Sequence, residues 1–259
     1  MTTEVEPVPF APHLRVRSRI AHSLMRFAPL IRWAEPELRG LGALVRPGDE
    51  VLDIGASHGM YTVPLAHLVG PAGKVFSFEP HPRQQRSLRR LKRLLGFRQL
   101  SITPAAIGTS EGEFTMRMPI KYGFPIYGHA HITSGAADYP DTVKTRTWRT
   151  AMTSIDGWAA RSHPGRIRFI KIDVEGFEPS VIEGGSELIA RDLPSLLVEI
   201  EDRHLARYGR TANGFADEIR TTWPAYGMYV WKDETWVAAD RVDFGIRNYL
   251  FATDAAFAR

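Results

Sequence analysis

One short segment, residues 50–62, constrains the fold of this chain more than any other. It reads Glu-Val-Leu-Asp-Ile-Gly-Ala-Ser-His-Gly-Met-Tyr-Thr. Val51–Ile54 is typical of a short buried strand, which Gly55 and Gly59 break into a loop, and apolar residues return at helical spacing from Tyr61 onwards. A strand, a glycine turn and a helix form the nucleotide-binding unit of doubly wound α/β proteins. Glycine lets the backbone approach the ligand, and the start of the helix offers free N–H groups.

A second acidic residue follows at the distance that such a unit requires. Lys74–Glu79 has the pattern of the next strand and ends in an acid before Pro80. The interval between Asp53 and Glu79 accommodates one loop, one helix and one strand. An acid at the end of the second strand binds the ribose hydroxyls of a nucleoside in these folds, so we expect Glu79 to do so here. The alternative is a strand-end carboxylate in a solvated turn.

Strand and helix patterns alternate along the chain and indicate an α/β fold. We expect an N-terminal tail and helical extension over residues 1–45, followed by one domain over residues 46–259. That domain is predicted to hold a doubly wound, mostly parallel sheet of seven strands that ends in a hairpin. Residues 113–118 and 143–148 alternate as paired strands do. The aromatic, glycine-rich segment 119–141 between them has the length of a lid or binding loop.

Composition narrows the classes of protein and partner. The chain has 259 residues, a net charge of +4 and no cysteine. The missing cysteine excludes disulfides, thiolate metal sites and cysteine nucleophiles, and it fits a cytoplasmic protein. No stretch approaches the roughly 20 apolar residues that cross a bilayer. The basic segment 13–33 predicts an amphipathic helix that packs on the domain, either as a wall of the binding site or as a homodimer contact.

A second basic segment predicts an amphipathic helix over residues 82–95. Its inward face is expected to carry four leucines, Leu88, Leu91, Leu94 and Leu95. Its arginines form either a patch for a polyanion or a solvated helix face. We favour the solvated face, because no aromatic residues interleave with the arginines, and we therefore do not expect nucleic acid as a partner.

Acidic residues follow two neighbouring strands of the predicted sheet. The fourth strand, residues 166–172, leads into Asp173 and Glu175, and the fifth, residues 195–200, carries Glu199. Ligands and catalytic groups gather at the carboxyl ends of strands in open α/β sheets. A carboxylate there can accept a proton. Asp173 and Glu199 together are also suited to a divalent cation such as Mg²⁺, and Glu201 and His204 are expected at the same edge.

Five strings in combination resemble the FkbM family. They are Val-Leu-Asp-Ile-Gly-Ala, Phe-Glu-Pro, Ala-Ala-Ile-Gly, Ile-Lys-Ile-Asp-Val-Glu-Gly-Phe-Glu and Val-Glu-Ile-Glu. The spacing Asp-x-Gly-x-x-x-Gly in the first also resembles motif I of class I S-adenosylmethionine-dependent methyltransferases. FkbM proteins are S-adenosylmethionine-dependent O-methyltransferases of bacterial natural-product and glycan pathways. The resemblance covers about residues 46–251 and selects no substrate.

The resemblance implies a division of labour among the residues. The glycine turn would line the methionine part of S-adenosylmethionine, Glu79 would bind the ribose, and Asp173 would face the transferred methyl group. The full set of expected cofactor contacts is Asp53, Gly55, Ala56, Ser57, Gly59, Tyr61, Thr62, Glu79, Pro80, His81, Ala105, Ala106 and Asp173. The expected catalytic residues are Asp173, Glu175, His129 and His131, and the expected metal ligands are Asp173 and Glu199.

The function that follows is O-methylation of a hydroxyl on a small molecule, a sugar, glycoside or polyketide. A nicotinamide-dependent oxidoreductase would need Gly-x-Gly-x-x-Gly in place of this turn. A nucleic-acid methyltransferase acting on exocyclic amines would carry an Asn- or Asp-Pro-Pro-aromatic string where this chain has Asp-Val-Glu-Gly. A non-catalytic S-adenosylmethionine-binding module is the remaining alternative, and it would not need acids beside the cofactor.

Overall fold

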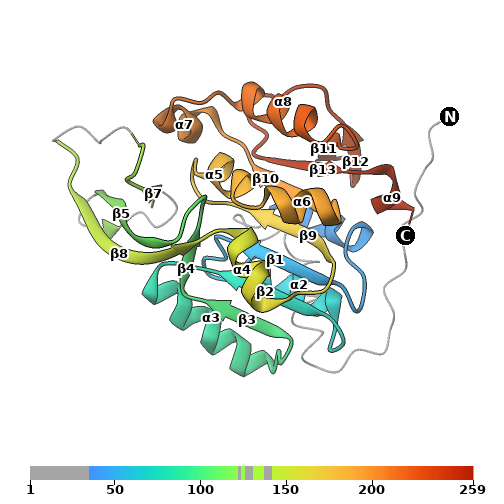
Figure 1. Cartoon of the computed structure of the whole chain (residues 1–259), viewed down its shortest axis with the longest axis horizontal. Helices are drawn as coiled ribbons and strands as arrows, with labels where there is room; N and C mark the ends of the chain where they lie inside the picture. The colour runs from blue at the N-terminus through green and yellow to red at the C-terminus, as the bar shows by residue number, and fades with distance from the viewer. Residues whose placement is uncertain (1–34, 122–123, 126–130, 137–141, 259) are drawn as a thin grey trace.

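The computed structural model describes residues 35–121, 124–125, 131–136 and 142–258. A central sheet lies between two layers of helices (Figure 1), with strand order β12-β11-β13-β10-β9-β1-β2-β3. Its strands are β1 (Glu50–Ile54), β2 (Lys74–Phe78), β3 (Leu100–Thr103), β9 (Ile167–Ile172), β10 (Ser195–Glu199), β11 (Gly227–Lys232), β12 (Thr235–Ala238) and β13 (Asn248–Ala252).

The sheet has eight strands in the described part of the chain, which corrects the predicted seven. The pairings from β3 through β10 are parallel, whereas those of β13, β11 and β12 are antiparallel. The additional strand β12 follows β11 through the two-residue turn Asp233–Glu234, and both residues have positive φ (50° and 62°). This geometry is typical of a type I′ hairpin. The sequence hides it, because neither position is glycine or asparagine.

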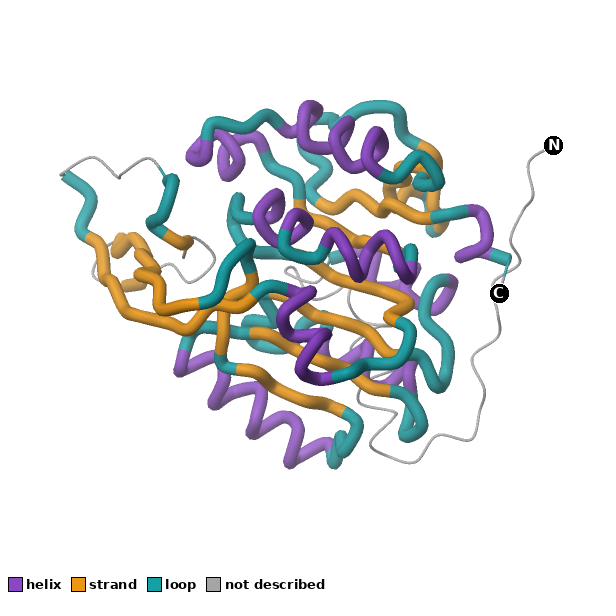
Figure 2. Tube along the Cα trace, in the orientation of Figure 1, coloured by secondary structure: helices purple, strands orange, loops and turns teal. Residues whose placement is uncertain are grey.

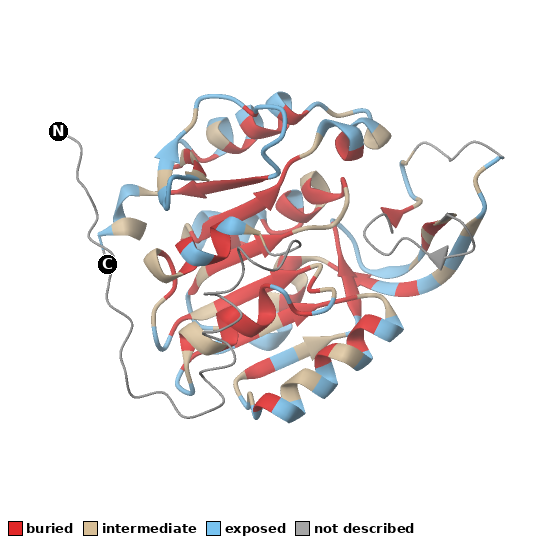
Figure 3. Ribbon diagram, turned by 180° about the vertical axis from the view of Figure 1, so that it is seen from behind, coloured by how far each residue is buried: buried red, intermediate tan, exposed pale blue. Residues whose placement is uncertain are grey.

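The helices divide between the two faces of the sheet (Figures 1 and 2). On one face α4 (Ile155–Ser162), α5 (Glu178–Glu183), α6 (Ser186–Asp192) and α8 (Ala212–Thr222) contribute to one buried apolar cluster. On the other face η2 (Pro36–Ala43), α2 (Thr62–Val69) and α9 (Asp254–Phe257) pack in a second cluster. Figure 3 shows that the strands between these layers are largely buried. Alternation along β9 sends Ile170 and Ile172 to the first cluster and Phe169 to the second.

A second sheet projects from the edge of the first (Figure 2). It contains β4 (Ala105–Ile107), β5 (Gly112–Lys121), β6 (Phe124–Pro125) and β8 (Thr145–Thr153), and β7 (His131–Ile132) pairs with β5. The prediction that residues 113–118 and 143–148 form paired strands is confirmed in part. β5 and β8 form a long antiparallel ribbon, but residues 113–118 pair with 146–151, and β8 begins at Thr145. Most of the predicted lid, residues 119–141, lies outside the described residues.

An apolar cluster ties this ribbon to the loop that follows β9. Met116 of β5 and Ile132 of β7 are buried with Phe177, and Val174 and Tyr208 pack against them. The hydroxyl of Tyr208 donates a hydrogen bond to the carbonyl of Ile132 at 2.8 Å. Tyr208 lies in η4 (Ala206–Tyr208), which follows α7 (Asp202–Leu205). The second sheet is therefore held beside the carboxyl end of β9.

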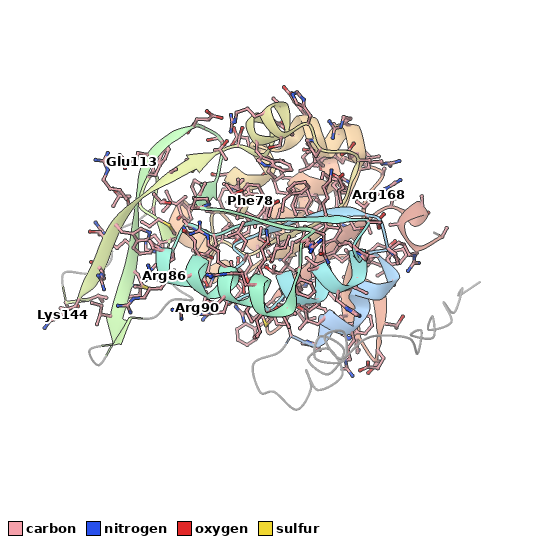
Figure 4. The ribbon with its side chains drawn as sticks, turned by 90° about the horizontal axis from the view of Figure 1, so that it is seen from below. Phe78, Arg86, Arg90, Glu113, Lys144 and Arg168 are labelled. Carbon is pink, nitrogen blue, oxygen red and sulfur yellow. The ribbon has the colours of Figure 1, made fainter. Side chains whose placement is uncertain are left out.

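The basic helix α3 has the bounds that the sequence predicts, Pro82–Leu95. Leu88 and Leu95 are buried as expected, but Leu94 is 73% exposed, so the prediction that all four leucines face inward is wrong at that position. Figure 4 shows Arg86 and Arg90 projecting from α3 at the surface of the molecule. The segment predicted as an N-terminal amphipathic helix, residues 13–33, lies outside the described residues.

Gly55 determines how closely β1 and β9 approach each other at their carboxyl ends. The amide of Asp173 donates a hydrogen bond to the carbonyl of Ile54 at 3.0 Å, which ties the end of β9 to the end of β1. Gly55 follows with φ of +84°, and a Cβ atom there would lie 1.8 Å from the carbonyl oxygen of Asp173. A side chain at this position would push the two strand ends apart.

We therefore expect Gly55→Ala to lose considerably more stability than Gly48→Ala. Both glycines have positive φ, but nothing lies within 4 Å of a Cβ atom at Gly48. Gly48→Ala should cost about 1–2 kcal/mol of backbone strain. Gly55→Ala should cost about 1–3 kcal/mol beyond that, because it adds a backbone clash. Urea unfolding of both variants measures the difference, and equal losses would show that the close approach is not rigid.

Candidate active site

The glycine turn after β1 is organised by Glu79. One carboxylate oxygen of Glu79 accepts a hydrogen bond from the Ser57 amide at 2.8 Å, and the other accepts from the His81 amide at 2.7 Å. Ser57 has φ of +46°, so this carboxylate holds a left-handed residue in place. Burial raises the pKa of Glu79 to about 7, although the two amide hydrogen bonds oppose the shift. The predicted ribose acid is therefore also the structural anchor of the turn.

The helix after the turn is anchored by a second buried acid. Asp53 accepts a hydrogen bond from the hydroxyl of Thr62, which lies 3.2 Å from the hydroxyl of Ser77. Burial raises the pKa of Asp53 to about 6. Gly59, with φ of +91°, brings the turn against α3, since a Cβ atom there would lie 3.1 Å from Leu88. The hydrogen bond between Thr62 and Asp53 thus joins β1 to the start of α2, the two elements that flank the turn.

His81 lies where α3 meets the second sheet. It caps α3, accepting a hydrogen bond from the amide of Arg83 at 3.3 Å, and its ring meets Trp148 of β8 edge-on at 4.9 Å. Burial, followed by the charges of Arg83 and Arg146, lowers the pKa of His81. Ala105 and Ala106, expected as cofactor contacts, form β4 of the second sheet and are buried there.

Asp173 stands at the centre of the carboxylate group predicted at the ends of β9 and β10. It keeps 25% of its side chain exposed, whereas Glu199 keeps 1% and Glu175 keeps 12%. Burial, with the neighbouring charge of Glu199, raises the pKa of Asp173 to about 7. Asp173 is thus the most accessible of these three acids, and it titrates near neutrality.

Beneath Asp173 lies a buried lysine that the sequence places in the middle of an apolar strand. Lys171 is 1% exposed, and its Nζ donates to Asn248 of β13 at 2.7 Å and lies 3.9 Å from Asp173. The same ammonium lies 4.9 Å from the centre of the Tyr61 ring. Burial opposes the charge on Lys171, but nearby carboxylates, first Asp173 and then Glu35, outweigh it and raise the pKa.

Glu35 joins the same network from the N-terminal segment. It accepts hydrogen bonds from the hydroxyl of Tyr61 and from the side-chain amide of Asn248, the latter at 2.9 Å. One carboxylate oxygen each from Glu35, Asp173 and Glu199 lie within 4.8 Å of one another. The pair predicted as metal ligands therefore has a third oxygen donor beside it.

Arg247 balances part of this negative charge. Its guanidinium forms ion pairs with Glu199 and with Glu201, the second at 2.5 Å, and lies 3.9 Å from Glu35. The carboxylates raise the pKa of Arg247 further, against the effect of burial. These ion pairs connect the end of β10 to the start of β13.

Glu175 and His204 form the far side of the group. The Nδ1 atom of His204 lies 3.1 Å from Glu175 and 3.7 Å from Glu199. Burial, followed by the charge of Arg203, lowers the pKa of His204 to about 4, so the imidazole is neutral at pH 7. Burial raises the pKa of Glu175 to about 10, and Glu199 and Asp173 add to the shift. The structure thus brings Glu175, Glu199, Glu201 and His204 to one rim, as predicted.

The two histidines predicted as catalytic, His129 and His131, are not among the side chains described at this rim. His131 is buried in β7, opposite Arg117 of β5, and His129 lies outside the described residues. The cofactor and catalytic roles assigned to individual residues stay predictions.

Sequence reasoning missed four contributors to the site, Glu35, Glu178, Arg247 and Asn248. Glu178 is the first residue of α5, and its carboxylate accepts hydrogen bonds from the amides of Val174 and Gly176 at 3.0 and 3.1 Å. It thereby shapes the loop after Asp173. A lysine inside the apolar string Phe-Ile-Lys-Ile was the one available signal of a buried network at this end of the sheet.

Residues 53–227 match the methyltransferase FkbM domain. The chain belongs to the FkbM methyltransferase family. The matched range begins at Asp53 and includes the turn, Glu79, Asp173 and Glu199. No curated protein matches the chain in sequence. Among the described residues, no helix of this FkbM protein is long and apolar enough to cross a membrane.

Several solved structures align with this chain at low sequence identity. A methyltransferase FkbM from Methylobacillus flagellatus KT aligns with a TM-score of 0.50 and 14% identity, over 91% of this chain and 58% of that one. This FkbM protein therefore spans less than two thirds of that relative. Fibrillarin from Aeropyrum pernix aligns with a TM-score of 0.46 and 14% identity, over 83% of this chain and 72% of that one. A SAM-dependent O-methyltransferase from Thermotoga maritima aligns with a TM-score of 0.44 and 13% identity, over 89% of this chain and 71% of that one.

The raised pKa of Asp173 predicts how its replacement changes stability with pH. The folded chain keeps a proton on Asp173 up to about pH 7, whereas the unfolded chain loses it near pH 4. The contribution of this group to the free energy of unfolding is thus present below about pH 4 and falls as the pH rises to about 7. We expect Asp173→Asn to exceed the wild type in stability by about 1–3 kcal/mol at pH 8 and to match it at about pH 4.

Glu201→Gln is the matched control, and its effect on the free energy of unfolding at pH 8 should have the opposite sign. Burial opposes its charge, but hydrogen bonds from Arg203 and Arg247 lower the pKa of Glu201. Its contribution is therefore present at neutral pH and is lost as the pH falls, so Glu201→Gln should destabilise the chain at pH 8. Urea unfolding at both pH values measures these differences. A gain for Asp173→Asn that does not change with pH would contradict the electrostatic explanation.

Proposed function

We propose that this protein is an S-adenosylmethionine-dependent O-methyltransferase that acts on a hydroxyl group of a small molecule. The observation that carries the proposal is the position of Asp173, a partly exposed carboxylate where β9 meets the glycine turn after β1. Family membership supports methyl transfer in general. Asp173 supports a hydroxyl acceptor in particular, because a hydroxyl must lose a proton as it is methylated.

The residues around Glu79 fit the nucleoside part of S-adenosylmethionine. An ionised carboxylate has about four lone-pair sites. The amides of Ser57 and His81 occupy two of them, which leaves two for ribose hydroxyls. Two further donors would favour the ionised form and lower the raised pKa of Glu79. His81 and Trp148 form an aromatic edge beside this position that suits the adenine.

Asp173 is suited to accept the proton of the acceptor hydroxyl. The glycine turn and Glu79 would hold S-adenosylmethionine, which would supply an activated methyl group: its bond to sulfur would break as its bond to the acceptor oxygen forms, and S-adenosylhomocysteine would leave. The hydroxyl proton passes to Asp173, whose pKa of about 7 lets it be ionised and still basic near neutral pH. Lys171, 3.9 Å away and fully buried, stabilises the ionised form and holds the carboxylate in place.

A bound divalent cation is the second candidate mechanism. Glu35, Asp173 and Glu199 offer three oxygen atoms within 4.8 Å of one another, the kind of donor that Mg²⁺ prefers. A cation there would lower the pKa of the acceptor hydroxyl in place of a protein base. Arg247 and Lys171 already pair with Glu199 and Asp173, so we favour Asp173 as the base. Chelation that silences turnover, with recovery in Mg²⁺, would favour the cation.

The proposed acceptor is a sugar, a glycoside or a polyketide in the cytoplasm. Nucleic acid is less suited, although α3 presents arginines at the surface. No aromatic side chain lies among the arginines of α3 on which a base could stack. A non-catalytic cofactor-binding module would have no use for a raised pKa at an accessible acid. Screening labelled S-adenosylmethionine against glycosides and polyketides tests the acceptor class.

We expect Glu79→Gln to weaken S-adenosylmethionine binding by about 1.5–3 kcal/mol, the range for hydrogen bonds to a charged group. Glu178→Gln is the matched control, because Glu178 is also a buried carboxylate that accepts two backbone amides. Glu178 lies after β9 rather than beside the turn, so the Glu178→Gln variant should bind S-adenosylmethionine with nearly the affinity of the wild type. Calorimetric titration of both variants measures the effect. Equal losses would move the ribose contact away from Glu79.

Asp173→Asn should lower turnover by at least about a hundredfold, the scale for loss of a general base. Affinity for S-adenosylmethionine should change little, because the turn and Glu79 remain intact. Wild-type turnover should rise as the pH increases through about 7, where Asp173 becomes ionised. Glu199→Gln should be milder, since Glu199 is 1% exposed and cannot reach an acceptor. Near-normal turnover in Asp173→Asn would contradict both the base and the cation mechanisms.

A further inference from the structure

Three side chains converge on the side of Glu199 that faces away from Arg247. Glu199 ends β10, His204 lies in α7, and Glu175 lies in the loop after β9. One donor atom from each of the three lies within 4.8 Å of the other two. This group differs from the all-oxygen group of Glu35, Asp173 and Glu199, because it includes an imidazole nitrogen and excludes Asp173.

The buried oxygens of this group lack hydrogen bonds. The Oε2 atoms of Glu175 and of Glu199 are inaccessible and accept no hydrogen bond from any described residue. Arg247 binds Glu199 through the other oxygen, Oε1. Buried carboxylate oxygens are costly unless a proton, a cation or a donor compensates them. A cation bound between these two atoms would compensate both of them.

The spacing of the three atoms matches ligands around one ion. The Nδ1 atom of His204 lies 3.1 Å from Oε2 of Glu175 and 3.7 Å from Oε2 of Glu199, yet neither oxygen accepts a hydrogen bond. Transition-metal bonds to nitrogen and oxygen are about 2.1 Å long, so neighbouring ligands lie roughly 3.0–3.6 Å apart for angles of about 90–120°. Ligands of one ion stand side by side at this distance without bonding to each other.

We propose that Glu175, Glu199 and His204 bind a divalent transition-metal ion such as Zn²⁺ or Mn²⁺. A neutral imidazole with two carboxylates suits these ions, whereas Mg²⁺ prefers oxygen ligands alone. With its proton on Nε2, the imidazole would present the lone pair of Nδ1 to the ion. The site is separate from the proton transfer at Asp173 and stands whether or not that proposal holds.

The ion would act as a clamp on the loop that positions Asp173. Glu175 has φ of +60°, and Gly176 follows with φ of +103°. A Cβ atom at Gly176 would lie 2.4 Å from the carbonyl oxygen of His204, so the loop already presses against α7. A metal ion shared by Glu175 and His204 would lock this contact. Its expected effect is therefore on stability and on the geometry of the loop, and not on the methyl group.

Metal titration of the chelator-treated chain, without S-adenosylmethionine or acceptor, tests the proposal. The wild type should bind about one Zn²⁺ or Mn²⁺ per chain in calorimetry, and its melting temperature should rise with metal concentration. Mg²⁺ at the same concentration should leave the melting temperature unchanged. His204→Gln and Glu175→Gln should each weaken binding by at least about tenfold, the scale for losing one ligand.

Two controls separate this site from its neighbours. Asp173→Asn should bind metal as the wild type does, because Asp173 is not in the group. His163→Gln, at an exposed histidine after α4, should also bind normally. Circular dichroism of each metal-free variant checks that it is folded. Absence of binding in the wild type would overturn the proposal. Loss of binding in Asp173→Asn with full binding in His204→Gln would also overturn it, by moving the ion to the all-oxygen group.

Discussion

The site depends on the crowding of negative charge where β9 and β10 end. Glu175 and Glu199 lie there with Asp173, and Glu35 approaches from the N-terminal segment. Lys171 and Arg247 pair with part of this charge, one from beneath and one from the rim. Burial of like charges is unfavourable, and the raised pKa of Asp173 records that cost. The fold maintains this arrangement because strong backbone pairing leaves the strand ends no alternative position.

That pairing explains why stability and reactivity are linked in this protein. The amide of Asp173 is tied to the end of β1, and Gly55 allows the two backbones to touch. The same contact brings Asp173 beside the turn that Glu79 organises through Ser57. A carboxylate that is costly to ionise in the folded state is a better base once ionised. The arrangement therefore lowers the stability of the folded chain at neutral pH and raises the proton affinity of Asp173.

The sequence predicted the parts of the fold that local patterns determine. The turn after β1, the helix α3, the paired ribbon and the meeting of Asp173 with Glu199 follow from strand and helix periodicity and from the rule that ligand sites lie at carboxyl strand ends. It did not predict β12, because its hairpin turn uses Asp233 and Glu234 at positive φ. It also missed Glu35 and Arg247, which are distant in sequence from β9 and reach the site through tertiary packing alone.

The central claim, that the turn and Glu79 bind S-adenosylmethionine, is tested most directly by calorimetric titration of the purified chain. The chain should bind S-adenosylmethionine or S-adenosylhomocysteine at one site and should not bind NAD. Its affinity should increase as the pH rises through about 7, because the ribose hydroxyls favour ionised Glu79, whose pKa is about 7 without a ligand. Binding of NAD with no binding of S-adenosylmethionine would contradict the account.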